Sequence, residues 1–123
     1  MAHPGCQPLL LMGTFLAVLQ AAMAQRDGLL VLPGQVAQLS CTIKPQHATI
    51  GVLGVSWYQQ RPGSAPHLLY YHSEESHYRP DDIPDRFSAT TDVAHNACVL
   101  TISPVQPEDD ADYYCSVAYS FDP

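Results

Sequence analysis

The stretch DADYYC, at positions 110–115, decides the fold of this chain. Tyr113 and Cys115 are two residues apart, so an extended strand points both of them to one face and points Tyr114 to the other. A cysteine and an aromatic ring on one face are typical of a strand that packs this face against a core. The stretch therefore predicts a strand with one buried face and one exposed face.

Three other segments alternate with the same period of two, placing apolar residues or cysteine at every second position. They are VAQLSCTI (36–43), GVSWYQQ (54–60) and ACVLTIS (97–103). Turn-forming residues separate these segments, at Pro33-Gly34, Arg61-Pro62-Gly63, Arg79-Pro80 and 104–110. Short strands between Pro and Gly turns predict an all-β antiparallel sandwich or barrel.

The inward faces of these strands carry Cys41, Trp57 and Cys115. A disulfide that joins two facing sheets, with a tryptophan packed against it, is the framework of the immunoglobulin sandwich. Tyr113 stands two residues before Cys115, where a tyrosine corner would return its hydroxyl to the backbone of the preceding turn. We therefore expect a Cys41–Cys115 disulfide with Trp57 and Tyr113 as core markers.

The first residues carry the pattern of a secretory signal. The apolar run LLLMGTFLAVL (9–19) is short for a membrane span, and Ala22-Met23-Ala24 suits a signal peptidase. We expect a signal peptide at 1–24 and one immunoglobulin variable-like domain at 25–123; a buried helix is the alternative for the apolar run. No second apolar stretch or lipid-anchor signal follows, so a protein of the secretory pathway without a membrane anchor is expected.

The 123-residue chain has a formal net charge of -7, which would repel nucleic acid. After removal of a signal peptide that contains Cys6, an odd number of cysteines remains, so one disulfide leaves one thiol. Cys98 shares its parity with Leu100 and Ile102, which predicts a buried and inert free thiol. The alternative is an intermolecular disulfide from Cys98 to a partner.

Longer segments resemble the framework of an immunoglobulin lambda light-chain variable domain. They are PGQVAQLSC (33–41), VSWYQQRPGSAPHLLYY (55–71), IPDRFS (83–88) and LTISPVQPEDDADYYC (100–115). The final strand of such a domain contains a Phe-Gly-x-Gly bulge, whereas SVAYSFDP (116–123) has Phe121 and neither glycine. The chain is therefore most similar to the V pre-B family, the variable-like part of the surrogate light chain, and we expect an immunoglobulin variable-type β-sandwich lacking the final strand. The resemblance also implies a structural ion pair between Arg86 and Asp109.

The same resemblance implies a function. The chain is expected to associate with immunoglobulin mu heavy chain in precursor B cells, as an assembly or escort factor in the endoplasmic reticulum, or in a secreted or cell-surface complex. A lambda-like surrogate constant chain is a further candidate partner, because a missing last strand would leave the edge of the preceding strand open to another chain. The residues implied at the heavy-chain interface are Tyr58, Gln60, Pro66, Leu68, Tyr71 and Tyr114.

A different class of function would use the loops. In this alternative the chain is a recognition receptor fragment that binds antigen through TIKPQHATIGVLG (42–54) and SVAYSFDP (116–123). The truncated end favours the assembly factor, because a loop without a closing strand is poorly held.

Chemical sites have little support in the sequence. His72, Glu74, Glu75 and His77 could suggest a metal site, but their segment is better interpreted as a polar hairpin between two edge strands. The acidic run at 108–112 lacks the glycine and the spacing of a calcium-binding loop. Asn96-Ala97-Cys98 is only a rare variant of a glycosylation sequon. We therefore expect no metal, no cofactor and no enzymatic activity.

Overall fold

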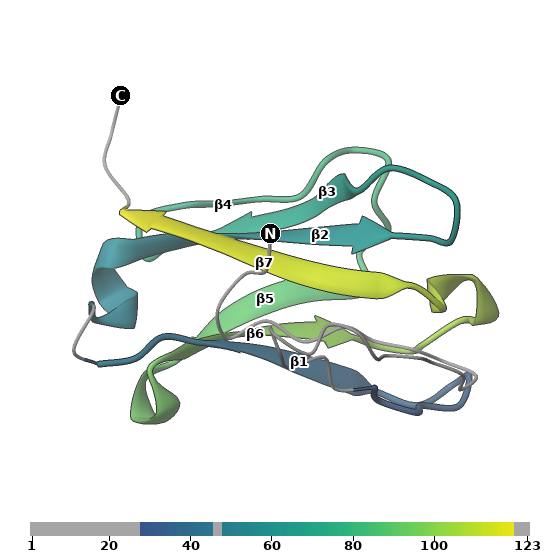
Figure 1. Cartoon of the computed structure of the whole chain (residues 1–123), viewed down its shortest axis with the longest axis horizontal. Coiled ribbons are helices and arrows are strands. Elements are labelled where there is room, and N and C mark those ends of the chain that lie inside the picture. Colours follow the sequence, from purple (N-terminus) through teal and green to yellow (C-terminus); the bar gives the residue numbers. More distant parts are fainter. Residues whose placement is uncertain (1–27, 46–47, 120–123) are drawn as a thin grey trace.

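The computed structural model describes residues 28–45 and 48–119, which form two antiparallel sheets packed face to face (Figure 1). One sheet has three strands in the order β1-β6-β5, and the other has four in the order β4-β3-β2-β7. The strands are β1 Ala37–Thr42, β2 Leu53–Gln60, β3 His67–His72, β4 His77–Tyr78, β5 Phe87–Asp92, β6 Ala97–Ile102 and β7 Asp112–Tyr119. Three short 3-10 helices lie in the connections, η2 Ile50–Val52, η3 Val93–His95 and η4 Pro107–Asp109. The described part of the chain is therefore the expected all-β sandwich.

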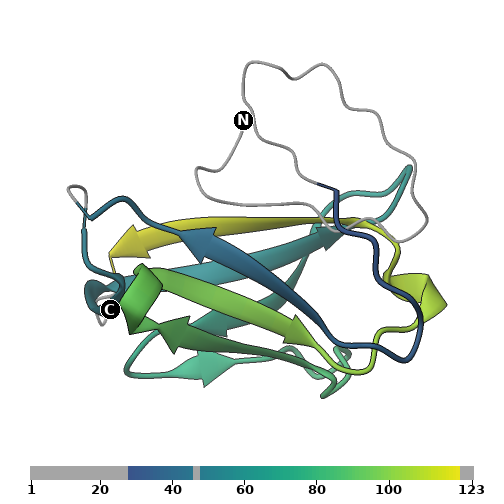
Figure 2. The ribbon, with the colours of Figure 1, turned by 90° about the horizontal axis from the view of Figure 1, so that it is seen from below.

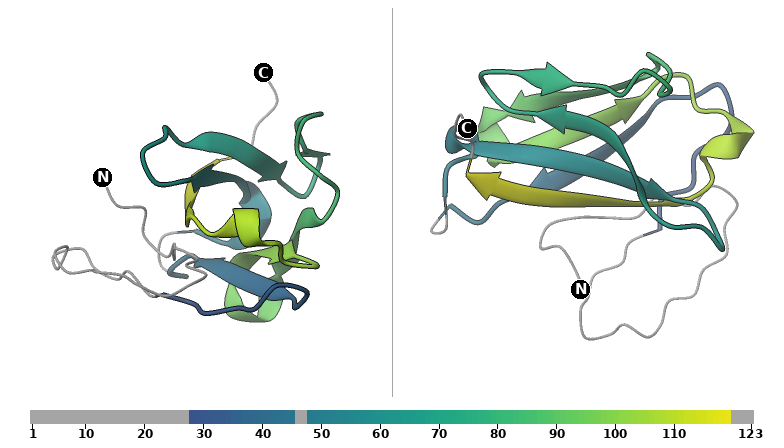
Figure 3. Two further views of the ribbon diagram at one scale, coloured as in Figure 1. Left: turned by 90° about the vertical axis from the view of Figure 1, so that its right-hand side faces the viewer. Right: turned by 90° about the horizontal axis from the view of Figure 1, so that it is seen from above.

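The pairing joins segments that are distant in the sequence. Strand β1 pairs with β6 in the three-stranded sheet, which faces the viewer in Figure 2. Strand β2 pairs with β7 in the four-stranded sheet, seen from its outer side in the right-hand view of Figure 3. Antiparallel pairing of strands that are far apart in the sequence, such as β1 with β6 and β2 with β7, is typical of Greek-key sandwiches.

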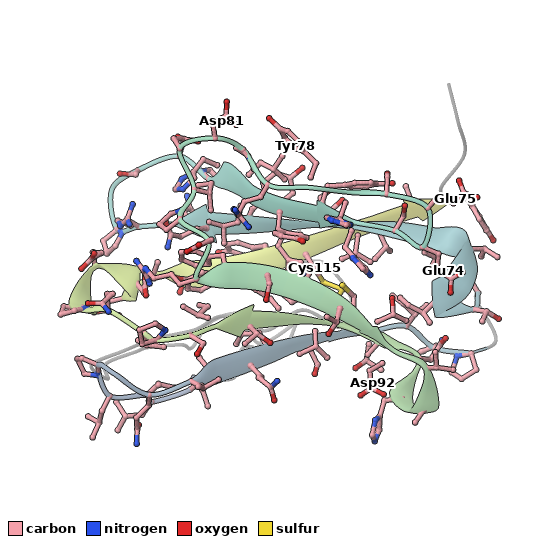
Figure 4. The ribbon with its side chains drawn as sticks, turned by 180° about the vertical axis from the view of Figure 1, so that it is seen from behind. Glu74, Glu75, Tyr78, Asp81, Asp92 and Cys115 are labelled. Carbon is pink, nitrogen blue, oxygen red and sulfur yellow. A yellow bond between two sulfur atoms is a disulfide. The ribbon has the colours of Figure 1, made fainter. Side chains whose placement is uncertain are left out.

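The period-two alternation correctly predicts which side chains reach the core. In β1 the buried residues are Ala37, Leu39 and Cys41, and the residues between them reach solvent to differing degrees. Cys41 is bonded to Cys115 with 6.2 Å between the two Cα atoms, so the disulfide connects the two sheets (Figure 4). Trp57 is fully buried and stands opposite Cys115 in the β2–β7 register. Closing a loop of 74 residues in sequence separation stabilises such a domain by about 4–5 kcal/mol on the chain-entropy view.

A polar network closes the turn before β7. The Tyr113 hydroxyl donates to the Asp109 carbonyl at 2.7 Å and accepts a hydrogen bond from the Gln59 amide at 2.8 Å. The Asp109 carboxylate is fully buried; it contacts both terminal nitrogens of Arg86 and accepts from the Gln106 backbone N–H. The hydrogen bond to Asp109 raises the pKa of Arg86, and burial raises the pKa of Tyr113. This network fixes the turn that leads into β7.

The hairpin prediction for 72–77 is right in kind and wrong in placement. Of the two strands that the hairpin joins, only β4 lies at an edge of the sheet, because β3 has β4 on one side and β2 on the other. His72 is half-buried rather than simply exposed, and its Nε2 lies 3.0 Å from the Thr91 hydroxyl of β5 in the opposite sheet. The sequence predicts two edge strands here, whereas in the structure β4 is an edge strand and β3 is internal.

Two predictions fall outside the described residues. The signal peptide at 1–24 is one, and the absent final strand after residue 119 is the other. None of the helices in residues 28–45 and 48–119 has the length and apolar character needed to cross a membrane.

Candidate functional site

The outer side of the four-stranded sheet gathers the residues that the resemblance implies at an interface. Tyr58 of β2 stands between Tyr114 of β7 and Leu68 of β3, its direct partners in the two registers. All three side chains are half-buried, although no second sheet of the described residues covers this side. Pro66, just before β3, is exposed. We call the outward-facing residues of this sheet the docking face; its main members are Tyr58, Gln60, Leu68, Tyr71, Tyr78 and Tyr114.

The tyrosines continue across the sheet to its β4 edge. Tyr71 of β3 pairs with Ser56 on one side and with Tyr78 on the other, so Tyr71 and Tyr78 lie on the same face. Tyr78 is 55% exposed, and Figure 4 shows its side chain pointing away from the sandwich. The sequence does not single out Tyr78, because the two residues of β4 are too few to show an alternation.

The docking face is nearly without charge. Strands β2, β3 and β7 contain no Lys, Arg or Glu, and one Asp, Asp112 at the start of β7. Gln60 is held by its side-chain amide, which donates to the Ser64 carbonyl at 2.9 Å. A polar but uncharged, tyrosine-rich surface combines apolar area with hydroxyl groups, as the centres of protein–protein interfaces do.

Asn96 braces the loop between β1 and β2. It adopts a left-handed conformation with φ of 53°, at the turn from η3 into β6. Its side chain accepts from the Ile50 N–H at 2.7 Å and donates to the Ile43 and Ala48 carbonyls at 2.8 and 3.0 Å. The backbone adds a fourth bond, from the Ile43 N–H to the Asn96 carbonyl at 2.9 Å. The end of the sandwich that carries η2 is thus tied to the turn between β5 and β6.

The suspected metal ligands do not converge. His72 is turned toward Thr91, and Glu74 lies beside Gly51 of η2, where an added Cβ would stand 3.2 Å from the Glu74 carboxylate. Figure 4 shows Glu74 and Glu75 at the η2 end of the sandwich. No group of three or more His, Cys, Asp or Glu residues that could hold a metal occurs in the described ranges. Burial, and His77 nearby, lower the pKa of His72.

The Cys98 thiol is free and fully buried. It stands opposite Cys41 in the β1–β6 register, so three sulfur atoms share one region of the core. Burial raises the pKa of this thiol, an effect that Trp57 partly offsets. A buried thiol with a raised pKa is a poor nucleophile, which favours a packing role.

Comparison with known proteins agrees with this geometry. The family profile described as immunoglobulin V-set domain matches residues 25–123. Human pre-B lymphocyte protein 3 is 75% identical over 119 residues, which cover 96% of this chain and 97% of that protein. The mouse immunoglobulin omega chain is 48% identical over 85 residues, covering 68% of this chain and 59% of the relative. The human immunoglobulin iota chain is 47% identical over 85 residues, covering 68% and 58%.

These matches extend the resemblance over nearly the whole chain, while the omega and iota chains are longer proteins of which it spans about three-fifths. The disulfide between the sheets is a bond of oxidising compartments, which suggests the secretory pathway. The chain belongs to the immunoglobulin V-set family, as a non-enzymatic variable-type binding domain related to the V pre-B and surrogate light chains.

Proposed function

We propose that this protein associates with the immunoglobulin mu heavy chain in precursor B cells and acts as a surrogate-light-chain-like assembly or escort factor. The observation that carries the proposal is the docking face, where Tyr58, Tyr71 and Tyr114 lie on one sheet almost without charge. Aromatic residues are enriched and charged residues depleted at the centres of interfaces, and tyrosine is frequent among the residues that contribute most of the binding energy.

The shape of the surface suits a second variable domain. A sheet face with half-buried tyrosines is broad, and a facing sheet could cover it with little change of backbone. The two sides of this sheet differ: the Tyr113 side chain is buried in the core, whereas Gln60 lies on the outer side and is partly exposed. The heavy-chain variable domain is the proposed occupant, since the relatives are immunoglobulin-type chains.

A lambda-like surrogate constant chain is a second proposed partner. Strand β7 ends the order β4-β3-β2-β7 within residues 28–45 and 48–119. An edge strand can be extended by a strand of another chain. The endoplasmic reticulum is the proposed place of assembly, because there the disulfide forms and the heavy chain is made.

The test measures binding of the purified protein to an isolated heavy-chain variable domain. Tyr58→Asp and Tyr114→Asp place a charge in the centre of the docking face, and each should raise the Kd by about 30-fold or more, the effect of losing a central interface residue. Thr90→Asp, on the exposed outer side of β5 in the other sheet, is the matched control and should bind as the wild type does. Far-UV circular dichroism and thermal unfolding verify that each variant folds.

The measurement can reject the proposal in two ways. Wild-type protein that does not bind any heavy-chain variable domain rejects the partner. Equal binding by wild type, Tyr58→Asp and Tyr114→Asp rejects the docking face. Repeating the capture from cells with and without the surrogate constant chain shows whether that chain is required.

Recognition through the loops is the second candidate function, and the brace at Asn96 favours it. A loop held by four hydrogen bonds is preorganised, which lowers the entropic cost of binding. This alternative predicts that Val52→Asp, at an exposed position of η2, abolishes binding while Tyr58→Asp does not. The two sets of variants therefore separate the two functions.

A further inference from the structure

Gly54 lies on the docking face in a place where no side chain fits. It belongs to β2, pairs with Ala118 of β7 and is buried although it faces outward. A Cβ atom added to Gly54 would stand 2.2 Å from the Tyr71 hydroxyl oxygen, 2.8 Å from its Cζ and 2.9 Å from one Cε. Because Cβ atoms essentially never approach other heavy atoms within 3.0 Å, the ring of Tyr71 occupies the space that a side chain at position 54 would need.

The register explains how Tyr71 reaches this position. Its direct neighbour across β2 is Ser56, so Gly54 is the diagonal neighbour two residues earlier on the same face. Long side chains reach diagonal neighbours on a sheet. Tyr78 stands on the other side of Tyr71, in β4. Tyr71 therefore extends across β2 and rests on the bare backbone of Gly54.

The backbone does not explain the glycine. Among the described glycines, only Gly34 and Gly63 have a positive φ, so the conformation of Gly54 is open to any residue. A glycine inside a strand loses side-chain packing and often marks the close approach of another group. Space for Tyr71 is the feature of this site that requires a glycine.

We propose that Gly54 is a positioning residue for partner binding: by leaving its space to Tyr71, it holds this ring across β2 in the orientation that meets the heavy-chain variable domain. The inference rests on the proposed function and adds to it the residue that sets the shape of the docking face. Fixing an aromatic ring before association reduces the ordering that binding must supply. Gly54 itself offers no side chain to the partner and acts through Tyr71.

Gly54→Ala is the test. The added methyl group displaces the Tyr71 ring, which is the movable part of the contact, and the strand backbone stays in place. Alanine also restricts the unfolded chain, so the free energy of unfolding should remain close to that of the wild type. Binding to the heavy-chain variable domain should weaken by about tenfold or more, as for loss of a central tyrosine.

The control is Gly51→Ala, the same substitution three positions earlier. The three atoms nearest to a Cβ there all belong to the exposed Glu74 carboxylate, the closest at 3.2 Å, and this flexible group can move aside. Gly51→Ala should therefore bind as the wild type does. Tyr71→Ala and the double variant Gly54→Ala/Tyr71→Ala complete a double-mutant cycle.

The cycle distinguishes the possible outcomes. If Gly54 acts through Tyr71, the double variant binds no more weakly than Tyr71→Ala alone. Losses that simply multiply in the double variant would overturn the inference, and so would Gly54→Ala binding at wild-type affinity. Failure of the wild type to bind would reject the proposed function, and the inference with it, so the two failures are distinguishable.

Discussion

Replacing Asn96 with alanine should loosen the loop between β1 and β2 and lower the free energy of unfolding by about 2–4 kcal/mol. The side chain makes three hydrogen bonds, to Ile50, Ile43 and Ala48. Each contributes about 1 kcal/mol net, and somewhat less here because the groups are only partly buried. Alanine in the left-handed conformation adds about 1 kcal/mol, which asparagine largely avoids.

Two further variants separate these contributions. Asn96→Gly removes the side chain without left-handed strain, so it should destabilise less than Asn96→Ala. Asn96→Asp keeps an acceptor for the Ile50 N–H but turns a carboxylate oxygen toward the Ile43 and Ala48 carbonyls, which repel it, so it should destabilise at least as much as Asn96→Gly. Urea unfolding gives the free energies, and in thermal unfolding each 1 kcal/mol should appear as a shift of about 4–8 °C in Tm for a domain of this size.

Hydrogen exchange supplies the local measurement. The Ile50 amide should exchange much faster in Asn96→Ala and Asn96→Gly than in the wild type, and amides in the middle of β6 should follow only the global stability. Stabilities within about 0.5 kcal/mol of the wild type in all three variants, a difference too small for a lost side-chain network, would refute the brace. Unchanged protection of Ile50 would refute it equally.

Three further predictions concern the core and its edge. Arg86→Met should cost about 3–5 kcal/mol in urea unfolding, because it leaves the buried Asp109 carboxylate unpaired, and adding Asp109→Asn should recover part of the loss; a cost below about 1 kcal/mol would contradict the pairing. The Cys98 thiol should react with a maleimide only on unfolding, since it is fully buried and its pKa is raised, and rapid labelling of the native protein or a Cys98-dependent dimer on a non-reducing gel would contradict this. The lowered pKa of His72 means that the unfolded state binds its proton first, so stability should fall as the pH drops below about 6.5 and level off below the folded-state pKa; His72→Gln should reduce that slope, and an identical slope in the variant would contradict it.

The frame of the domain follows from short-range rules. Alternation with period two is a property of the strand itself, so the inward positions of Cys41, Trp57 and Cys115 can be predicted without knowing which strands pair. Parity does not choose among the three cysteines, because Cys98 also points inward; the Cys41–Cys115 pairing is predicted from the immunoglobulin framework, in which a disulfide between the sheets packs against a tryptophan.

The outward positions of Tyr58 and Tyr114 follow from the same parity, but the set of interface residues is implied by the resemblance to light-chain variable domains. Parity alone would place Leu68 and Tyr71, three residues apart, on opposite faces, and the bulge in the β2–β3 register brings them to the same face.

Contacts that depend on three-dimensional placement could not be named in this way. The brace joins Asn96 to Ile43, Ala48 and Ile50, which precede it by 53, 48 and 46 positions in the chain. The local sequence of Asn96, Asn-Ala-Cys, indicates only a weak glycosylation signal. The structure shows the amide nitrogen donating two hydrogen bonds, so an attached glycan would have to displace the loop. The resemblance likewise predicts Tyr71 at the interface but not its position along the face, because the direction in which a ring leans depends on which neighbour leaves room. A partner contacts the Tyr71 ring at its position along the face. Substitutions at the residues that set this position, Gly54 above all, should therefore change binding while the fold persists.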